Sequence, residues 1–288
     1  MKTSALSIAR PNFHSCGRTL AGLIAPMMAP MMAAMITPSL TAAESYENVI
    51  RAELRPGWRM ADGSHMAALH LELAPGWKTY WRAPGDAGIP PQFRWKRAKG
   101  TQSVRVHWPA PEVFHQSGMR SVGYSGSVTL PLRVQLNKSG DTRLKGVIDI
   151  GICKEVCLPH RVRVEAVLPA AQTKPDPTIA AALADEPYGA EDAGVSNVSC
   201  SVSPATSGLT VRAQIAMPKG TGREETVIET ANPEIWVGEP KTWWEGSRLM
   251  AEAQMAHMNG DAFALDRSRL RITVLGGSMP VDIRGCDG

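Results

Sequence analysis

The chain has little net charge and no familiar pattern of catalytic residues. Its 288 residues carry a formal charge of +4, from 31 basic and 27 acidic side chains. So small an excess gives no electrostatic basis for binding nucleic acid or an acidic surface. No serine, histidine and aspartate order, no pair of carboxylates and no phosphate-binding glycine loop stands out. The sequence therefore offers no support for a hydrolase or a nucleotide-binding protein.

Long apolar runs are also missing, except near the N-terminus. There, three basic residues precede the apolar run Leu20–Ile36, and small residues ending at Ala43 follow it. This order is typical of a secretory signal peptide, and the run is short and interrupted by two prolines, unlike a membrane span. The sequence predicts a signal peptide over residues 1–43, cleaved near Ala43, and an exported chain with no membrane span after cleavage.

Cysteine is scarce, with five in the whole chain. Cys16 lies in the predicted signal peptide, so the mature protein keeps Cys153, Cys157, Cys200 and Cys286. An even number of cysteines in an exported protein suggests disulfides. Without the signal peptide the formal charge falls to +1, and about 245 residues remain, enough for one large domain or two small ones.

Short β-type runs dominate residues 44–169. Several alternate apolar and polar residues, and glycine, proline, asparagine or aspartate separates them. These runs are Ala67–Leu73, Val104–Trp108, Val128–Leu136, Leu144–Ile150 and Arg161–Val167. The pattern predicts an antiparallel β-sandwich. Five of the eight tryptophans lie between Trp58 and Trp108, and we interpret them mainly as core residues.

The β rhythm stops in a linker of prolines and acidic residues over residues 170–195, which has room for one short helix near residues 179–184. It resumes over residues 196–288, which predicts a second, smaller sandwich. The expected strands there are Val198–Val202, Leu209–Ile215, Thr226–Thr230, Arg248–Met255 and Leu270–Leu275. The fold class is therefore all-β, with two antiparallel sandwich domains.

Cys153 and Cys157 are the most informative pair of residues. They lie in a short turn between two expected strands, which would bring their Cβ atoms within disulfide range if the strands form a hairpin. A disulfide that closes so small a ring is a weak staple. The spacing leaves three readings open: an inert disulfide, a redox pair, or a zinc or copper site completed by His160.

The aromatic segment Gly76–Pro91, followed by Trp95, Trp108–Pro111, Gly123–Pro131 and the cysteine turn, resembles a known family. These ordered motifs are similar to the N-terminal periplasmic domain of the thiol:disulfide interchange protein DsbD. They are closer still to the N-terminal region of the related copper-sensitivity suppressor ScsB. The similarity covers about residues 46–169, and residues 196–288 resemble the second immunoglobulin-like module of the ScsB type only loosely.

The resemblance implies an immunoglobulin-like periplasmic domain that relays electrons by thiol–disulfide exchange, as a component of a protein-disulfide reductase without a cofactor. Its implied partners are thioredoxin-like proteins and a membrane electron-transfer protein, and copper tolerance is an implied context. Cys157 would form the mixed disulfide with a partner, and Cys153 would resolve it. The chain lacks the membrane and thioredoxin-like domains of the full-length reductases, so its electrons are expected from a separate protein.

Several other residues belong to this hypothesis. The DsbD domain has a longer cysteine spacing and covers its pair with a loop that bears an aromatic residue. The corresponding stretch here offers Phe114, Met119 and Tyr124 as candidates for shielding the sulfurs. The resemblance also places Tyr80 near the pair, where it could shape the partner-docking surface.

We interpret Cys200 and Cys286 as a structural disulfide, because they flank almost the whole second domain. A cluster of Met250, Met255, His257 and Met258 is interpreted as packing rather than as a copper site, since Met255 and His257 would share a face of a strand while Met258 points away from them. No metal site is predicted. The competing hypotheses are a non-catalytic adaptor with two structural disulfides and a copper or zinc carrier that uses Cys153, Cys157 and His160.

Overall fold

The structure of the protein is a computed structural model. Most of its strands form where apolar and polar residues alternate in the sequence. The structure describes residues 48–96 and 100–288. The predicted signal peptide, residues 1–43, lies outside the described residues. The described residues belong to one compact unit that contains both sandwiches. No helix among them is long and apolar enough to cross a membrane.

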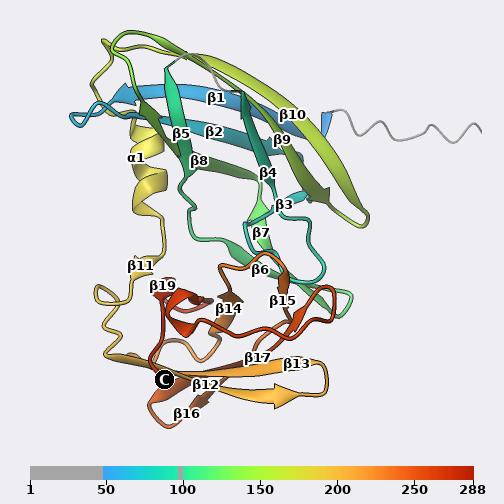
Figure 1. The fold of residues 1–288 in the computed structure, drawn as a ribbon. Coiled ribbons are helices and arrows are strands. Elements are labelled where there is room, and N and C mark those ends of the chain that lie inside the picture. The colour runs from blue at the N-terminus through green and yellow to red at the C-terminus, as the bar shows by residue number, and fades with distance from the viewer. Residues whose placement is uncertain (1–47, 97–99) are drawn as a thin grey trace, which may run out of the picture. The chain divides into compact units, whose positions relative to one another are not determined.

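The first sandwich consists of two antiparallel sheets (Figure 1). One has the order β1 (Ile50–Arg59), β2 (His65–Leu73), β8 (Ser127–Leu136) and β5 (Thr101–Val106). The other has the order β10 (Cys157–Leu168), β9 (Thr142–Cys153), β3 (Lys78–Tyr80), β7 (Met119–Ser125) and β6 (Glu112–Gln116), and β4 (Gln92–Lys96) also pairs with β9. The inner faces form one apolar core that includes the fully buried Trp81, Leu69 and Ile148.

The second sandwich is smaller and also has two sheets. One has the order β11 (Tyr188–Gly189), β19 (Val281–Arg284), β18 (Arg271–Leu275) and β14 (Glu225–Glu229). The other has the order β12 (Asn197–Ala205), β13 (Gly208–Ala216), β17 (Arg248–His257) and β15 (Ile235–Val237), and β16 (Lys241–Glu245) also pairs with β17. A short 3-10 helix, Arg267–Arg269, precedes β18. Apart from the parallel β11–β19 pair, the pairs between these named strands are antiparallel.

The predicted linker is ordered and divides between the two sandwiches. Helix α1 (Pro177–Ala184) packs against β8 of the first sandwich, while β11 joins the sheet of the second. The sandwiches also contact each other directly. Val227 and Leu275 belong to the same buried apolar cluster as the first core, and Arg82 forms an ion pair with Glu229 at 2.9 Å.

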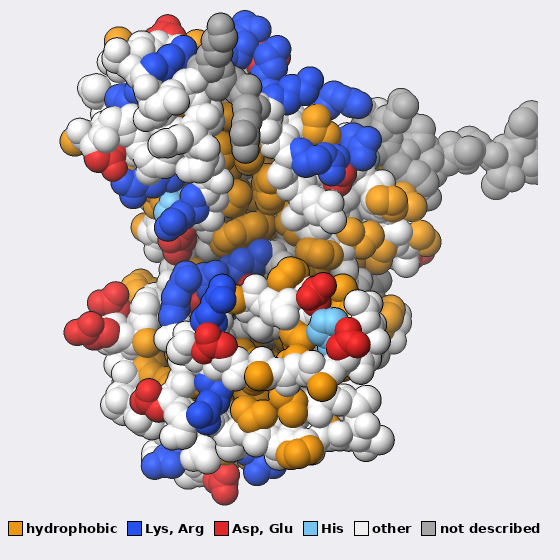
Figure 2. All heavy atoms as spheres, in the orientation of Figure 1, with side chains coloured by type: hydrophobic (Ala, Val, Ile, Leu, Met, Phe, Trp, Pro, Cys, Tyr) orange, Lys and Arg blue, Asp and Glu red, His pale blue; other side chains and the backbone are white. Residues whose placement is uncertain are grey.

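The outer surface carries both signs of charge. Figure 2 shows basic and acidic side chains interspersed with hydrophobic ones on the face in view. This mixture agrees with the small net charge of the sequence.

Candidate functional site: a hairpin disulfide

A long β-hairpin brings the two central cysteines together. Strands β9 and β10 pair continuously from Thr142↔Leu168 to Cys153↔Cys157, with three residues left for the turn. The Cα atoms of Cys153 and Cys157 lie 4.1 Å apart, and their sulfurs form a disulfide. The ladder begins at Cys157, two residues before Pro159. That proline is tolerated because β10 is an edge strand, where a missing N–H need not break the ladder.

The two cysteines differ in exposure. Cys153 ends β9 and is buried, with 5% of its surface exposed. Cys157 is exposed, as are the turn residues before it, and Val156 has 61% of its surface exposed. An incoming thiolate can therefore reach the Cys157 sulfur much more easily than the Cys153 sulfur.

Tyr80 on β3 provides a hydrogen-bond donor to the exposed sulfur. Its hydroxyl lies 3.0 Å from Cys157 Sγ and 3.3 Å from the Ala87 carbonyl oxygen. Neither the disulfide sulfur nor the carbonyl oxygen carries a proton, so the single hydroxyl proton of Tyr80 is shared between these two acceptors. Burial raises the pKa of Tyr80, which keeps the hydroxyl protonated. The resemblance anticipated Tyr80 near the pair, and the structure places it in direct contact.

Lys78, two residues earlier on β3, is a site residue that the sequence analysis missed. Only 8% of it is exposed, and its Nζ donates to Gln116 Oε1 at 3.0 Å and lies 4.9 Å from the centre of the Phe114 ring. Burial lowers its pKa. Gln116 Nε2 in turn donates to the Lys154 carbonyl at 2.9 Å, in the cysteine turn. No pattern in the sequence pointed to Lys78, because β3 has only three residues and all three are buried.

A small pocket of about 70 Å³ opens beside the disulfide. It is lined by Lys78, Tyr80, Ala87, Gln116, Ser117, Met119, Ser121, Cys153, Lys154, Glu155 and Cys157. Met119 is 59% exposed, at the tip of the hairpin formed by β6 and β7. That hairpin lies beside Cys157, which remains exposed.

The other shielding candidates lie away from the pocket. Tyr124 is in the core, where its hydroxyl donates to the Pro109 carbonyl at 2.8 Å and burial raises its pKa well above the ordinary range. Phe114 packs under Lys78 rather than against the sulfurs. The pairing register of β3, β6 and β7 determines where the side chains of Phe114 and Tyr124 lie. The local sequence of residues 114–124 does not reveal that register.

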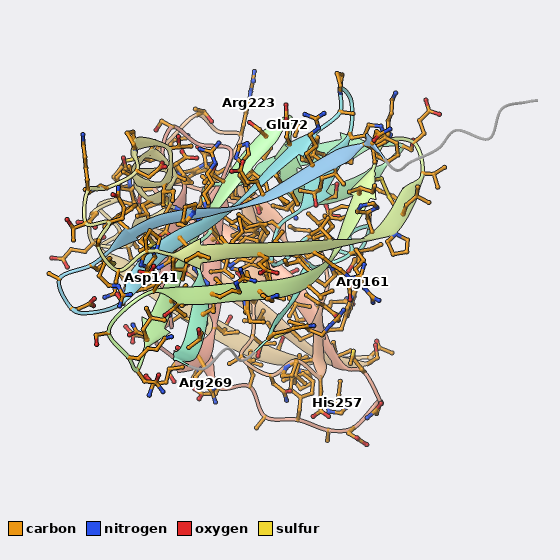
Figure 3. All side chains as sticks on the ribbon, turned by 90° about the horizontal axis from the view of Figure 1, so that it is seen from above. Glu72, Asp141, Arg161, Arg223, His257 and Arg269 are labelled. Carbon is orange, nitrogen blue, oxygen red and sulfur yellow. A yellow bond between two sulfur atoms is a disulfide. The ribbon has the colours of Figure 1, made fainter. Side chains whose placement is uncertain are left out.

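His160 does not join the cysteines. It follows Cys157 by three positions on β10, so the two side chains point to opposite faces of the strand. His160 instead lines a separate groove with Arg161, which forms an ion pair with Asp149 and is labelled in Figure 3. Within residues 48–96 and 100–288, no group of three or more histidine, cysteine, aspartate or glutamate side chains is arranged to hold a metal ion.

The methionines that cluster in the sequence of the second sandwich differ in burial. Met250 and Met255 are buried in β17, whereas Met258 is 68% exposed beyond the strand end. His257, labelled in Figure 3, lies 3.7 Å from Glu234 and 3.6 Å from Asp261. In the second sandwich, Cys200 and Cys286 form a disulfide with Cα atoms 5.7 Å apart.

An antiparallel sandwich presents a hairpin disulfide with one accessible sulfur and a tyrosine hydroxyl beside it, and thiol–disulfide exchange requires this kind of access to one sulfur. Residues 49–178 match the family of the N-terminal domain of the thiol:disulfide interchange protein DsbD. Over these residues the chain is similar to DsbD N-terminal domains.

The fold as a whole resembles solved structures, and 14 chains match. One is the crystal structure of the N-terminal periplasmic domain of ScsB from Proteus mirabilis, with a TM-score of 0.62 and 22% sequence identity. The match covers 83% of this chain and 92% of that one, so it includes both immunoglobulin-like sandwiches. No curated protein sequence matches the chain.

Proposed function

We propose that the first sandwich relays electrons in the periplasm by thiol–disulfide exchange through Cys153 and Cys157. The observation that carries this proposal is the asymmetry of the pair: Cys157 is exposed and contacts the Tyr80 hydroxyl, while Cys153 is buried behind it. The DsbD N-terminal match over residues 49–178 and the periplasmic source of the ScsB domain support the chemistry and the compartment.

The exchange runs through a mixed disulfide. A thiolate of a reduced donor attacks Cys157 Sγ, the Cys153–Cys157 bond breaks, and Cys153 leaves as a thiolate that takes up a proton. A second donor thiolate then attacks the donor's own sulfur in the mixed disulfide and releases Cys157. The donor becomes oxidised by two electrons and the pair becomes reduced. The same steps in reverse, with Cys157 as the nucleophile and Cys153 resolving, reduce an oxidised acceptor.

Tyr80 supports both directions. Its hydroxyl is already aimed at Cys157 Sγ, and a hydrogen bond to a thiolate is stronger than one to a neutral sulfur. It therefore stabilises Cys157 whenever that residue is the leaving group or the attacking nucleophile.

The surface around Cys157 fits protein partners. Val156 beside it and Met119 across the pocket are large hydrophobic side chains with 61% and 59% of their surface exposed. Apolar side chains gathered around a reactive group are typical of a transient docking surface. Thioredoxin-like proteins, with a membrane electron-transfer protein behind them, are the proposed donors and acceptors.

Trapping tests the proposal directly. In the Cys153→Ala variant, the Cys157 thiolate can attack the disulfide of an oxidised thioredoxin-like protein but has no resolving partner in its own chain, so a mixed disulfide should accumulate on a non-reducing gel. The Cys157→Ala variant is the matched control, because the remaining Cys153 is buried and should give little adduct. In the wild type, reduced thioredoxin should reduce this pair while Cys200–Cys286 stays oxidised.

A pair that resists thioredoxin in the folded wild type, with a reduction potential below about −300 mV, would contradict the relay. The non-catalytic adaptor would then be the better explanation. Stoichiometric copper or zinc on the reduced protein, lost in the Cys157→Ser variant, would instead favour the metal-carrier hypothesis.

A further inference from the structure

The second sandwich holds the hairpin that forms one wall of the disulfide pocket. This β6–β7 hairpin turns at Ser117 and Gly118, whose φ angles of 53° and 76° are both left-handed. Two positive φ values define a tight two-residue turn that fixes the register of its strands. Directly beside the turn, His115 and Arg120 face each other across the two strands, one residue outside the Gln116↔Met119 pair.

Both members of that cross-strand pair reach one carboxylate, which belongs to Glu225 at the start of β14. His115 Nε2 lies 2.8 Å from Glu225 Oε1. Arg120 Nε donates to Glu225 Oε2 at 2.5 Å, and Arg120 Nη2 donates to the Thr226 carbonyl at 3.1 Å. One side chain of the second sandwich therefore fastens both strands of the hairpin.

Burial makes this contact firmer than an ordinary surface ion pair. The Arg120 side chain is only 4% exposed, and that of Glu225 is 29% exposed. Burial by itself would raise the pKa of Glu225, but the hydrogen bonds from His115 and Arg120 outweigh it and lower the pKa. Removing the carboxylate would leave a buried guanidinium without its counter-charge, which is far more costly than breaking an exposed pair.

The fastened residues are the immediate neighbours of the pocket wall. Gln116, next to His115, donates to the Lys154 carbonyl in the cysteine turn. Met119, next to Arg120, is the exposed hydrophobic residue on the far side of the pocket. Glu225 therefore constrains Gln116, which contacts the cysteine turn, and Met119, which belongs to the proposed docking surface. Each of these residues is directly bonded in the chain to a residue that Glu225 holds.

A second contact reaches the opposite wall. Trp236 on β15 donates from Nε1 to Asp86 Oδ1 at 3.0 Å, and Asp86 precedes Ala87, whose carbonyl lies 3.3 Å from the Tyr80 hydroxyl. Trp236 is 44% exposed, so this contact is weaker than the one at Arg120. Both walls of the pocket nevertheless have a partner in the second sandwich.

We propose that Glu225 is a positioning residue for partner recognition: through His115 and Arg120 it fixes the β6–β7 hairpin, and with it Gln116 and Met119, in the arrangement that a thioredoxin-like protein contacts when it attacks Cys157. This inference rests on the proposed function. The second sandwich would then assist the exchange reaction although Glu225 does not contact the sulfurs. Since Cys157 is exposed, a small thiol needs no such surface.

Two reductants separate positioning from simple loss of structure. In the mature full chain, the Glu225→Ala variant should be reduced by thioredoxin about fivefold more slowly or worse, while its reduction by dithiothreitol stays within about twofold of the wild type. Glu225→Gln, which keeps an acceptor for Arg120, should lie between. The matched control is Glu252→Ala, which removes the carboxylate that accepts from Arg212 Nε at 2.7 Å within the second sandwich. It should change neither rate.

Unchanged thioredoxin kinetics in folded Glu225→Ala would overturn the inference, and so would an equal change with both reductants. If Glu225→Ala does not fold, His115→Ala removes one of the two attachments and should give a smaller loss of the same kind. If the wild type is not reduced by thioredoxin, the proposed function fails, and amide hydrogen exchange at Ser117–Arg120 tests the inference alone. Faster exchange there in the Glu225 or His115 variant supports the attachment, and equal exchange overturns it.

Discussion

At the scale of residues, the disulfide gains its chemical character from its neighbours rather than from its spacing. Cys153 and Cys157 are four positions apart in sequence but sit in opposite environments, one buried and one exposed. Tyr80 and Lys78, which project from β3 on the same face, add a hydroxyl donor and a buried cation. The spacing alone also fits an inert hairpin disulfide, whereas this set of neighbours favours exchange at one sulfur.

Replacing Tyr80 with phenylalanine should make the disulfide harder to reduce. The hydroxyl stabilises the thiolate of the reduced state more than the disulfide, so its loss should shift the reduction potential by roughly 30–60 mV to more negative values. This range follows from about 1.5–3 kcal/mol for a hydrogen bond to a charged group. Equilibration in glutathione or dithiothreitol buffers, followed by thiol alkylation, measures the shift.

The control for this variant is Tyr188→Phe, since Tyr188 is 45% exposed and lies in β11 of the second sandwich. It should leave the potential unchanged. If Tyr80→Phe also leaves the potential unchanged, the Tyr80 hydroxyl only donates to the Ala87 carbonyl oxygen. Tyr80 would then have no role in the exchange reaction.

At the scale of elements, helix α1 turns the predicted linker into part of the first sandwich. Asp176 caps the helix by accepting hydrogen bonds from the backbone N–H groups of Thr178 at 2.8 Å and Ile179 at 3.1 Å, and Pro177 opens the first turn. Ile179 is fully buried in a small cluster with Trp58 and Met66 on the outer side of the β1–β2 sheet. The helix therefore covers apolar surface that the sandwich core leaves outside.

The Ile179→Ala variant should lose about 2–5 kcal/mol of unfolding free energy, because the deletion leaves a cavity at a fully buried position. Denaturant unfolding measures this loss. Val167→Ala is the matched control, since Val167 is 46% exposed on β10 and should cost about 0.5 kcal/mol or less. A loss for Ile179→Ala no larger than the control's would mean that α1 is only loosely attached.

At the scale of the whole molecule, the second disulfide closes most of the second sandwich. Cys200 on β12 and Cys286 beside the C-terminus are 86 positions apart. The backbone around the bridge is also paired, because the Cys200 N–H donates to the Asp287 carbonyl at 2.7 Å and the Asp287 N–H donates to the Val198 carbonyl at 3.0 Å. The C-terminal segment is thus held both covalently and by hydrogen bonds.

Removing this bridge should cost far more stability than removing the redox pair. The double variant Cys200→Ala, Cys286→Ala should lose about 4 kcal/mol, whereas Cys153→Ala, Cys157→Ala should lose about 2 kcal/mol, because the entropy that a disulfide removes from the unfolded chain grows with the loop it closes. Urea unfolding of both variants beside the wild type tests the order. The reverse order would contradict the structural interpretation of Cys200 and Cys286.

The class of fold and the likeness to the DsbD N-terminal family could both be predicted from the sequence. Strand alternation was enough for the long strands β2, β8, β9 and β10, each of which contains a predicted run. The β9–β10 hairpin also followed, since two alternating runs around a short turn have few other ways to pair. The short strands β3 and β6 were not predicted. Segments of three to five residues beside aromatic residues or proline are too short to show a period of apolar and polar residues.

The residues that surround the sulfurs could not be predicted from the sequence, because they come together only in the folded chain. Lys78 and Gln116 meet at the cysteine turn because β3 lies between β9 and β7, a pairing of segments about 40 to 75 positions apart in sequence. Glu225, in the second sandwich, contacts His115 and Arg120 of the β6–β7 hairpin, which lie more than 100 positions away in sequence. A local pattern shows which residues of a segment face the core. Which segments become neighbours depends on how the sheets of both sandwiches pack to bury their apolar faces, and this packing exists only in the folded chain.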